Sequence, residues 1–311
     1  MDGKGYETPI LFIVFNRPDC TQKVFERIRS IQPKKLFVAA DGPRLDKAGE
    51  KENCDIVRKV VSEIDWNCDL KTLFREENFG CKIAVCNALD WFFAQVEEGI
   101  VLEDDCLPDL SFFRFCQELL EKYRDDTRVM HIAGTNFHGA WCREPEYSYY
   151  FSNFGSIWGW ASWKRAWKLY DVDMTAYPEI KRKEYLKDIC RSKDELEFRI
   201  SIFDQVSSGQ LNTWDYQWTF ARLINSGLSI VPKENLITNI GFSINATHTN
   251  RVLTKSMSFP ATQCKFPLKH PVFLIRDTVS DMRFVNFLTS YEHGNSIKKK
   301  IKKFFLKDNK F

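Results

Sequence analysis

Short apolar runs alternate with amphipathic segments through the first half of the chain. In each amphipathic segment the apolar residues recur every three or four positions, as they do on the buried face of a helix. Alternation of this kind is typical of an α/β fold with a parallel sheet. The predicted strands are residues 10–15, 36–40, 70–74, 99–102 and 129–133. The predicted helices lie around residues 24–31, 54–64, 83–96 and 108–123, and the last of them is expected to start at Pro108.

The regular alternation weakens after about residue 138, where the sequence YSYYFSNFGSIWGWASW is rich in aromatic residues and glycine. Residues 201–224 are predicted to be helical, with a break at Gly209, and residues 228–232 to form a strand. A chain of 311 residues can form one large domain or two small ones.

The composition is that of a folded protein. Hydrophobic residues make up 44% of the chain and aromatic residues 14%, which excludes a disordered or fibrous protein. The longest apolar run, residues 10–15, is far shorter than the roughly 20 residues needed to cross a bilayer. Residues 1–9 lack the features of a secretory signal. We therefore expect a cytoplasmic protein whose ten cysteines, which include no CxxC pair, are reduced thiols.

The positive charge is concentrated at the end of the chain. Residues 298–311 carry seven lysines and one aspartate, or +6, whereas the net charge of the whole chain is only +3. Ile297, Ile301, Phe304 and Phe305 fall on one face if this segment is helical. A basic amphipathic helix of this kind is suited to an anionic membrane surface. The alternative is a solvated end, and nucleic acid is not favoured because no groove-reading module accompanies the lysines.

Polar residues follow the first four predicted strands at their carboxyl ends, where ligands bind in open parallel sheets. They are Asn16 and Arg17, then Asp41, then residues 75–78, and finally Glu103, Asp104 and Asp105. Three carboxylates directly after a buried strand need a cation to offset their desolvation, and oxygen ligands suit Mg²⁺ or Mn²⁺. The alternative is a solvated acidic turn before the next helix. Neither the dinucleotide fingerprint nor the P-loop is present.

An ordered set of short motifs resembles a known family. The segments PILFIVFNRPD, VAADG, REENFG, VLEDDCLPDLSFF, SIWGWASW and NTWDYQW…GLSIVP, within residues 9–242, resemble inverting glycosyltransferases of the GT-A fold. More narrowly they are similar to a bacterial group of nucleotide-diphospho-sugar transferases, also called hemolytic-protein-like. They are also similar to the Golgi N-acetylglucosaminyltransferase that initiates complex N-glycans.

The resemblance implies a GT-A-like α/β fold, with a mostly parallel sheet flanked by helices and an aromatic-rich region on the acceptor side. It implies a nucleotide-sugar-binding half at 1–136 and an acceptor and catalytic-base half of the same domain at 137–290. The basic amphipathic tail then occupies 291–311.

The resemblance also implies roles for the polar residues at the donor end. Asp105 would bind Mn²⁺ or Mg²⁺ and Asp104 the ribose or a metal-bound water, while Glu103 would contact the donor sugar. Arg17 and Asp41 would hold the nucleoside. The Glu-Asp-Asp sequence departs from the Asp-x-Asp of many related transferases but matches the Golgi enzyme.

Further roles follow from the same resemblance. Asp215 would be the general base, with Trp214 packed beside the sugar, although an aspartate there could instead cap the following helix. Trp158 and Trp160 would lie on the acceptor side, or else pack in the core. Two more residues complete the expected site, Asn78 shaping the loop near the diphosphate and His248 closing over the metal.

The sequence therefore predicts a metal-dependent inverting glycosyltransferase that moves a hexosyl or N-acetylhexosaminyl group from a nucleoside diphosphate sugar, with a UDP-sugar favoured. The acceptor would be a saccharide hydroxyl in surface glycan synthesis, and a lipid-linked acceptor would place the protein peripherally at the inner face of the cell membrane. One alternative is a sugar-nucleotide nucleotidyltransferase, although FNRPD lacks the Gly- and Lys/Arg-rich loop of that class. The other is a non-enzymatic membrane-binding or lytic protein.

Overall fold

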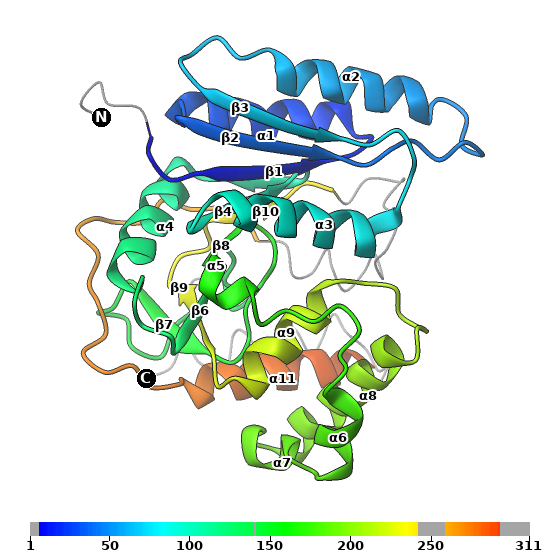
Figure 1. Ribbon diagram of the computed structural model, residues 1–311. Coiled ribbons are helices and arrows are strands. Elements are labelled where there is room, and N and C mark those ends of the chain that lie inside the picture. The colour runs from blue at the N-terminus through cyan, green and yellow to red at the C-terminus, as the bar shows by residue number, and fades with distance from the viewer. Residues whose placement is uncertain (1–5, 140, 242–258, 293–311) are drawn as a thin grey trace.

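A central eight-stranded sheet organises the protein in a computed structural model that describes residues 6–139, 141–241 and 259–292 (Figure 1). Its strand order is β3-β2-β1-β4-β8-β6-β9-β7. The strands are β1 (Ile10–Val14), β2 (Lys35–Ala40), β3 (Asp69–Phe74), β4 (Glu98–Glu103), β6 (Val129–Ala133), β7 (Tyr149–Ser152), β8 (Trp160–Trp163) and β9 (Leu228–Pro232). Pairing makes β7 and β8 antiparallel to the other strands of this sheet. The predicted α/β fold with a mostly parallel sheet is confirmed.

Helices cover both faces of this sheet. Helices α1 (Pro18–Ile31), α2 (Glu50–Ser62) and α4 (Leu110–Lys122) pack on one face. Helices α3 (Gly80–Gln95), α5 (Lys164–Trp167) and α9 (Asp215–Ile224) pack on the other. The remaining helices are α6 (Tyr177–Arg182), α7 (Leu186–Ile189), α8 (Lys193–Ser207) and α11 (Thr278–Glu292). In Figure 1, α6, α7, α8 and α11 lie together below the sheet.

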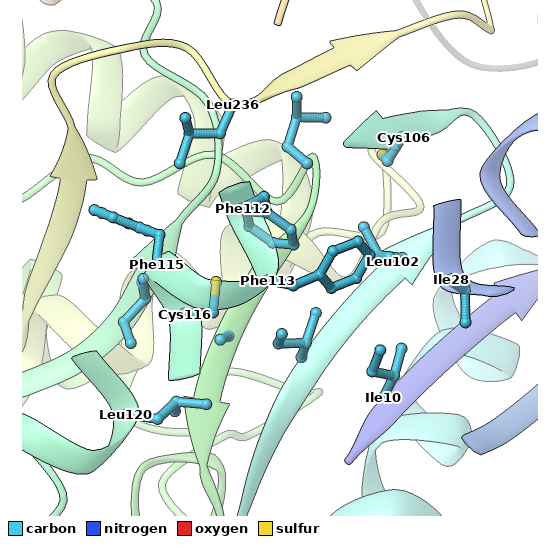
Figure 2. Close-up of a cluster of buried hydrophobic side chains, with 14 of the residues drawn as sticks. Ile10, Ile28, Leu102, Cys106, Phe112, Phe113, Phe115, Cys116, Leu120 and Leu236 are labelled. Atoms are coloured by element: carbon cyan, nitrogen blue, oxygen red, sulfur yellow. The ribbon is translucent and has the colours of Figure 1, made fainter. Parts of the chain in front are cut away.

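Burial on both faces explains why inner strands such as β1 and β2 are nearly continuous apolar runs. Successive strand side chains point to opposite faces. Ile10 and Phe12 of β1 therefore belong to the core beneath α1 and α4, whereas Leu11 between them belongs to the core beneath α3. Figure 2 shows the first of these cores, where phenylalanines of α4 meet residues of β1 and β4.

The start of α4 differs from the prediction. Pro108 ends the short strand β5 (Cys106–Pro108), which pairs with β10 (Ile237–Asn239), and α4 begins only at Leu110. The side chain of Asp109 caps this helix by accepting a hydrogen bond from the backbone N–H of Ser111 at 2.9 Å. The expected helical start at Pro108 was wrong because a strand partner more than a hundred residues away binds that segment.

The predicted helical region 201–224 is divided between two helices. Helix α8 starts earlier, at Lys193, and ends at Ser207, and α9 begins at Asp215. The seven residues between them include Gly209, whose φ of 76° lies in the left-handed region that glycine tolerates. No helix within the described ranges is both long enough and apolar enough to span a membrane.

Candidate active site

The polar residues that follow β1 to β4 meet at one edge of the sheet. These four strands are parallel, so their carboxyl ends lie side by side. Arg17, Asp41, Arg75 and Glu103 all line a single cavity of about 710 Å³ at this edge. The structure thus brings together the polar residues that follow four different strands.

The acidic cluster lies around Arg17. Its Nη1 atom is 2.6 Å from Oδ2 of Asp105 and 3.2 Å from Oδ1 of Asp104. Asp104 also accepts a hydrogen bond from the backbone N–H of Phe15 at 3.3 Å. Arg17 therefore offsets part of the negative charge of Asp104 and Asp105 in this structure.

Burial and mutual repulsion raise the pKa values of two carboxyl groups of this acidic cluster. Burial and the neighbouring negative charges raise the pKa of Glu103, and burial raises the pKa of Asp104 even though Arg17 opposes the shift. Asp215 contributes to the raised pKa of Glu103. Glu103 and Asp215 line the same cavity, which their separation in sequence could not reveal.

The same two carboxylates act on Cys81 of α3. Burial, followed by the charges of Glu103 and Asp215, raises the pKa of its thiol to about 12. Cys81 lines the cavity, and the raised pKa disfavours the thiolate form that a nucleophilic cysteine needs.

The described residues supply few protein ligands for a metal. No three His, Cys, Asp or Glu side chains within residues 6–139, 141–241 and 259–292 are grouped to hold one. His248, which was expected to close over the metal, lies outside the described residues. Magnesium and manganese often use only one or two carboxylates and take their other ligands from substrate phosphates and water. Asp105, at the cavity wall, fits a metal shared in this way with a diphosphate.

A close backbone approach restricts the space around Asp105. The backbone N–H of Ile240 donates to the carbonyl of Asp105 at 2.8 Å. A Cβ atom at Gly241 would lie 2.1 Å from Oδ2 of Asp105. Only glycine fits at residue 241 without moving the carboxylate.

Asp41 holds the start of α3 in place. Its carboxylate accepts hydrogen bonds from the backbone N–H groups of Phe79 and Gly80 at 3.0 Å. Asn78 donates through Nδ2 to the carbonyl of Gly42 at 2.7 Å. The loops after β2 and β3 are thereby fixed to each other.

Asp215 is the first residue of α9. The preceding residue, Trp214, occupies the N-cap position and makes no side-chain cap, so Asp215 lies in the first turn of α9 and is not its N-cap residue. Burial raises the pKa of Asp215, although hydrogen bonds from the Thr213 hydroxyl and from backbone N–H groups oppose the shift. A partly desolvated carboxylate facing a cavity is suited to accept a proton.

The structure places the two tryptophans expected on the acceptor side in different environments. Trp158 lines the cavity and packs edge-on against Phe137, with ring centroids 5.5 Å apart. Trp160 is 0% exposed and stacks between His131 and Trp214, at 5.2 and 6.0 Å. The acceptor-side role expected for Trp160 is therefore corrected to core packing. Trp214 is also mostly buried but borders the cavity.

Sequence reasoning missed a second ion pair at this edge of the sheet. Arg44 lines the cavity, and its Nε atom donates to the buried carboxylate of Glu50 at 3.0 Å. Glu50 also accepts from Nδ2 of Asn16 at 2.8 Å. The position of Arg44 just after the Asp41 turn was the available signal.

Comparison with known proteins finds no family model and no curated protein that matches this chain. Solved structures with a similar chain path include TarS residues 1–349 of S. aureus, at 14% identity and a TM-score of 0.41 over 74% of this chain. A UDP-glucose pyrophosphorylase bound to UDP-glucose matches at 12% identity and a TM-score of 0.37, over 78% of this chain and 96% of its own. A cytidylyltransferase from Leptospira borgpetersenii matches at 10% identity and a TM-score of 0.31, over 68% of this chain and 75% of its own. The chain spans 59% of the TarS chain. With all three TM-scores below 0.5, these likenesses say nothing of its activity.

Proposed function

We propose that this chain is a metal-dependent inverting glycosyltransferase that uses a nucleoside diphosphate sugar. The observation that carries the proposal is the presence of two carboxylate groups in one cavity, Asp215 at the start of α9 and the cluster of Glu103, Asp104 and Asp105 after β4. An inverting transfer needs one carboxylate to take a proton and a separate site to neutralise the leaving diphosphate.

Asp215 is the proposed general base. The acceptor hydroxyl gives its proton to the Asp215 carboxylate while its oxygen forms a bond to the anomeric carbon of the donor. The bond from that carbon to the diphosphate breaks, and its electron pair leaves on the phosphate oxygen. Burial around Asp215 favours the neutral carboxyl, so proton uptake is assisted there.

In this proposal the donor occupies the charged part of the cavity, beside the carboxyl ends of β1 to β4. Arg17 and Asp41 hold the nucleoside, with Asn78 shaping the adjoining loop. Asp104 contacts the ribose and Glu103 the donor sugar.

The proposed metal belongs to this donor end. Asp105, and His248 as a further ligand, would hold Mn²⁺ or Mg²⁺. When bound, such an ion stabilises negative charge on the departing diphosphate. Trp214, at the cavity border, is proposed to limit the space beside the donor sugar.

The tail is proposed to bind an anionic membrane surface. Its residues 293–311 lie outside the described residues, so this proposal rests on its seven lysines and apolar face alone. The acceptor proposed for this location is a saccharide of a surface glycan.

Calorimetric titration of the full chain with UDP, GDP, CDP and dTDP, with and without Mn²⁺, tests the donor site. Asp105→Asn should abolish metal-dependent binding, whereas Asp215→Asn should bind the nucleotide normally and lose sugar transfer. Asp173→Asn, at an exposed position outside the cavity, is the matched control for both.

Several outcomes would contradict the proposal. Equal loss of nucleotide binding in Asp105→Asn and Asp215→Asn would contradict the separation of roles. Pyrophosphate release from a nucleoside triphosphate and a sugar phosphate would indicate a nucleotidyltransferase instead. Vesicle leakage that survives Asp105→Asn, without any nucleotide binding, would indicate a lytic protein.

A further inference from the structure

The two ends of the cavity differ in chemistry. The end beside β1 to β4 carries the charged groups described above. The other end is lined by apolar side chains from four parts of the chain, here called the apolar lobe, namely Phe137, Phe154, Trp158, Ile202, Phe284 and Leu288.

Interlocking rings build the wall of the apolar lobe. Phe284 of α11 stacks on Phe137, with ring centroids 5.2 Å apart and an angle of 9° between the planes. It also meets the edge of Phe154, at 5.1 Å and 70°. Because the rings come from α11 and from the segments after β6 and β7, packing fixes their positions relative to the sheet.

Two polar side chains at this end, Arg199 and Ser156, have partners within the protein. The guanidinium of Arg199 donates to Oε1 of Glu195 at 2.9 and 3.0 Å and lies 4.2 Å over the ring of Phe154. The hydroxyl oxygen of Ser156 accepts a hydrogen bond from the backbone N–H of Trp158 at 3.1 Å. A sugar ring buried here would leave hydroxyl groups poorly paired, at a cost in free energy, whereas an apolar group needs no such partners.

Helix α9 connects the two ends. Asp215 and Thr219 both line the cavity and lie one helical turn apart. Asp215 also shares the cavity with Glu103 of the charged end. A ligand whose apolar part fills the lobe can therefore present a hydroxyl near Asp215.

We propose that the apolar lobe binds an apolar aglycone of the acceptor, aliphatic or aromatic, and so selects acceptors whose sugar carries such a group. This inference rests on the proposed function, because only a transferase has an acceptor for the lobe to select. The binding of an apolar group to the lobe is nevertheless measurable without any transfer.

The experiment titrates the full chain with methyl, butyl and octyl β-D-glucoside, each below its micellar concentration, and with phenyl β-D-glucoside. The sugar serves only as a soluble carrier. Binding should tighten by up to about fourfold for each methylene that the lobe encloses. Comparison of the octyl with the phenyl compound distinguishes an aliphatic from an aromatic aglycone.

Two variants test whether the apolar group binds in the apolar lobe. Phe284→Asn and Leu288→Gln should each remove most of the dependence on chain length. Phe273→Asn is the matched control, because Phe273 is 71% exposed and lies outside the cavity. Urea midpoints of the three variants show which of them fold, and Leu288→Gln provides the test if Phe284→Asn does not.

The outcomes separate this inference from the proposed function. Dependence on chain length that disappears in the lobe variants and persists in Phe273→Asn supports the inference. Equal binding of methyl and octyl glucoside, or loss of the dependence in Phe273→Asn alone, overturns it. UDP titration of the same samples reports on the donor site, so a chain that binds octyl glucoside but no nucleotide contradicts only the proposed function.

Discussion

The buried carboxylate of Glu195 should contribute strongly to stability. It is 1% exposed and lies between Arg199, which is 2% exposed, and Arg276 from the segment before α11. Its Oε1 atom accepts from Nη2 of Arg199 at 2.9 Å and from Nη2 of Arg276 at 3.0 Å, and Oε2 accepts from the backbone N–H of Arg191 at 2.8 Å. Glu195→Gln keeps the shape of the side chain but leaves two arginines without this negative charge.

The magnitude follows from the burial. Removing one partner of a buried ion pair costs about 3 to 5 kcal/mol. Since the glutamine oxygen can still accept one hydrogen bond, we expect a loss of about 3 kcal/mol in the free energy of unfolding. With a urea m-value of about 3 kcal/mol/M, the midpoint should fall by about 1 M.

Urea unfolding followed by tryptophan fluorescence measures this shift. Glu197→Gln is the matched control, because Glu197 lies on the same helix with a 63% exposed side chain that pairs with Lys193 at 3.4 Å. Such an exposed pair contributes at most about 1 kcal/mol. A midpoint shift in Glu195→Gln no larger than that in Glu197→Gln would refute the reasoning.

The pH dependence gives a second check on the same residue. Burial opposes the charge on Glu195, but Arg199, the Arg191 backbone and Arg276 outweigh it and hold its pKa below the ordinary value. A lowered folded-state pKa stabilises the protein above the ordinary pKa of glutamate, about 4.3. This stabilisation is lost as the pH falls through the folded-state pKa. The difference between the wild-type chain and Glu195→Gln should thus be full at pH 7 and shrink below about pH 4.

Three further predictions concern the cavity and the tail. The rate of sugar transfer should fall as the pH drops through the raised pKa of Asp215, giving an acid limb above the ordinary range of aspartate, and a rate independent of pH there would exclude Asp215 as the base. Gly241→Ala should displace the carboxylate of Asp105 and weaken Mn²⁺-dependent nucleotide binding at least tenfold, or about 1.4 kcal/mol, in calorimetry. Replacing the lysines of residues 298–311 by glutamine should abolish co-sedimentation with anionic vesicles while nucleotide binding is retained; unchanged co-sedimentation would locate the membrane contact elsewhere.

The inner strands β1, β2 and β4 were predictable from sequence because they are buried on both faces. The strands β7 and β8 of the aromatic-rich region were not predicted. In β1 every residue from Ile10 to Val14 faces one core or the other or the cavity, so the strand is a continuous apolar run. The edge at which Arg17, Asp41 and Glu103 gather was predictable for the same reason, since parallel strands align their carboxyl ends.

Contacts between distant residues were not predictable. Nothing in the local sequence indicates that Arg17 pairs with a carboxylate 88 residues later, or that Asp41 binds the backbone at Phe79. Trp158 and Trp160 are the same residue type two positions apart, so the sequence does not distinguish them. The intervening Gly159 has a φ of 62°, and the structure places Trp158 at the cavity and Trp160 in the core. The apolar lobe also escaped prediction, because its rings come from segments that packing alone brings together.

The wall of the cavity is assembled from both ends of the described chain, from Arg17 after β1 to Leu288 of α11. An unfolded chain holds no such enclosure, so a ligand that fills the cavity binds only the folded state. By mass action, a ligand at one hundred times its dissociation constant would raise the free energy of unfolding by about 2.7 kcal/mol. Thermal or urea protection is therefore a general screen for the natural ligands of this protein, and it requires no knowledge of the reaction. Because the wall joins β1 to α11, a ligand that spans it would also slow amide hydrogen exchange in both elements together.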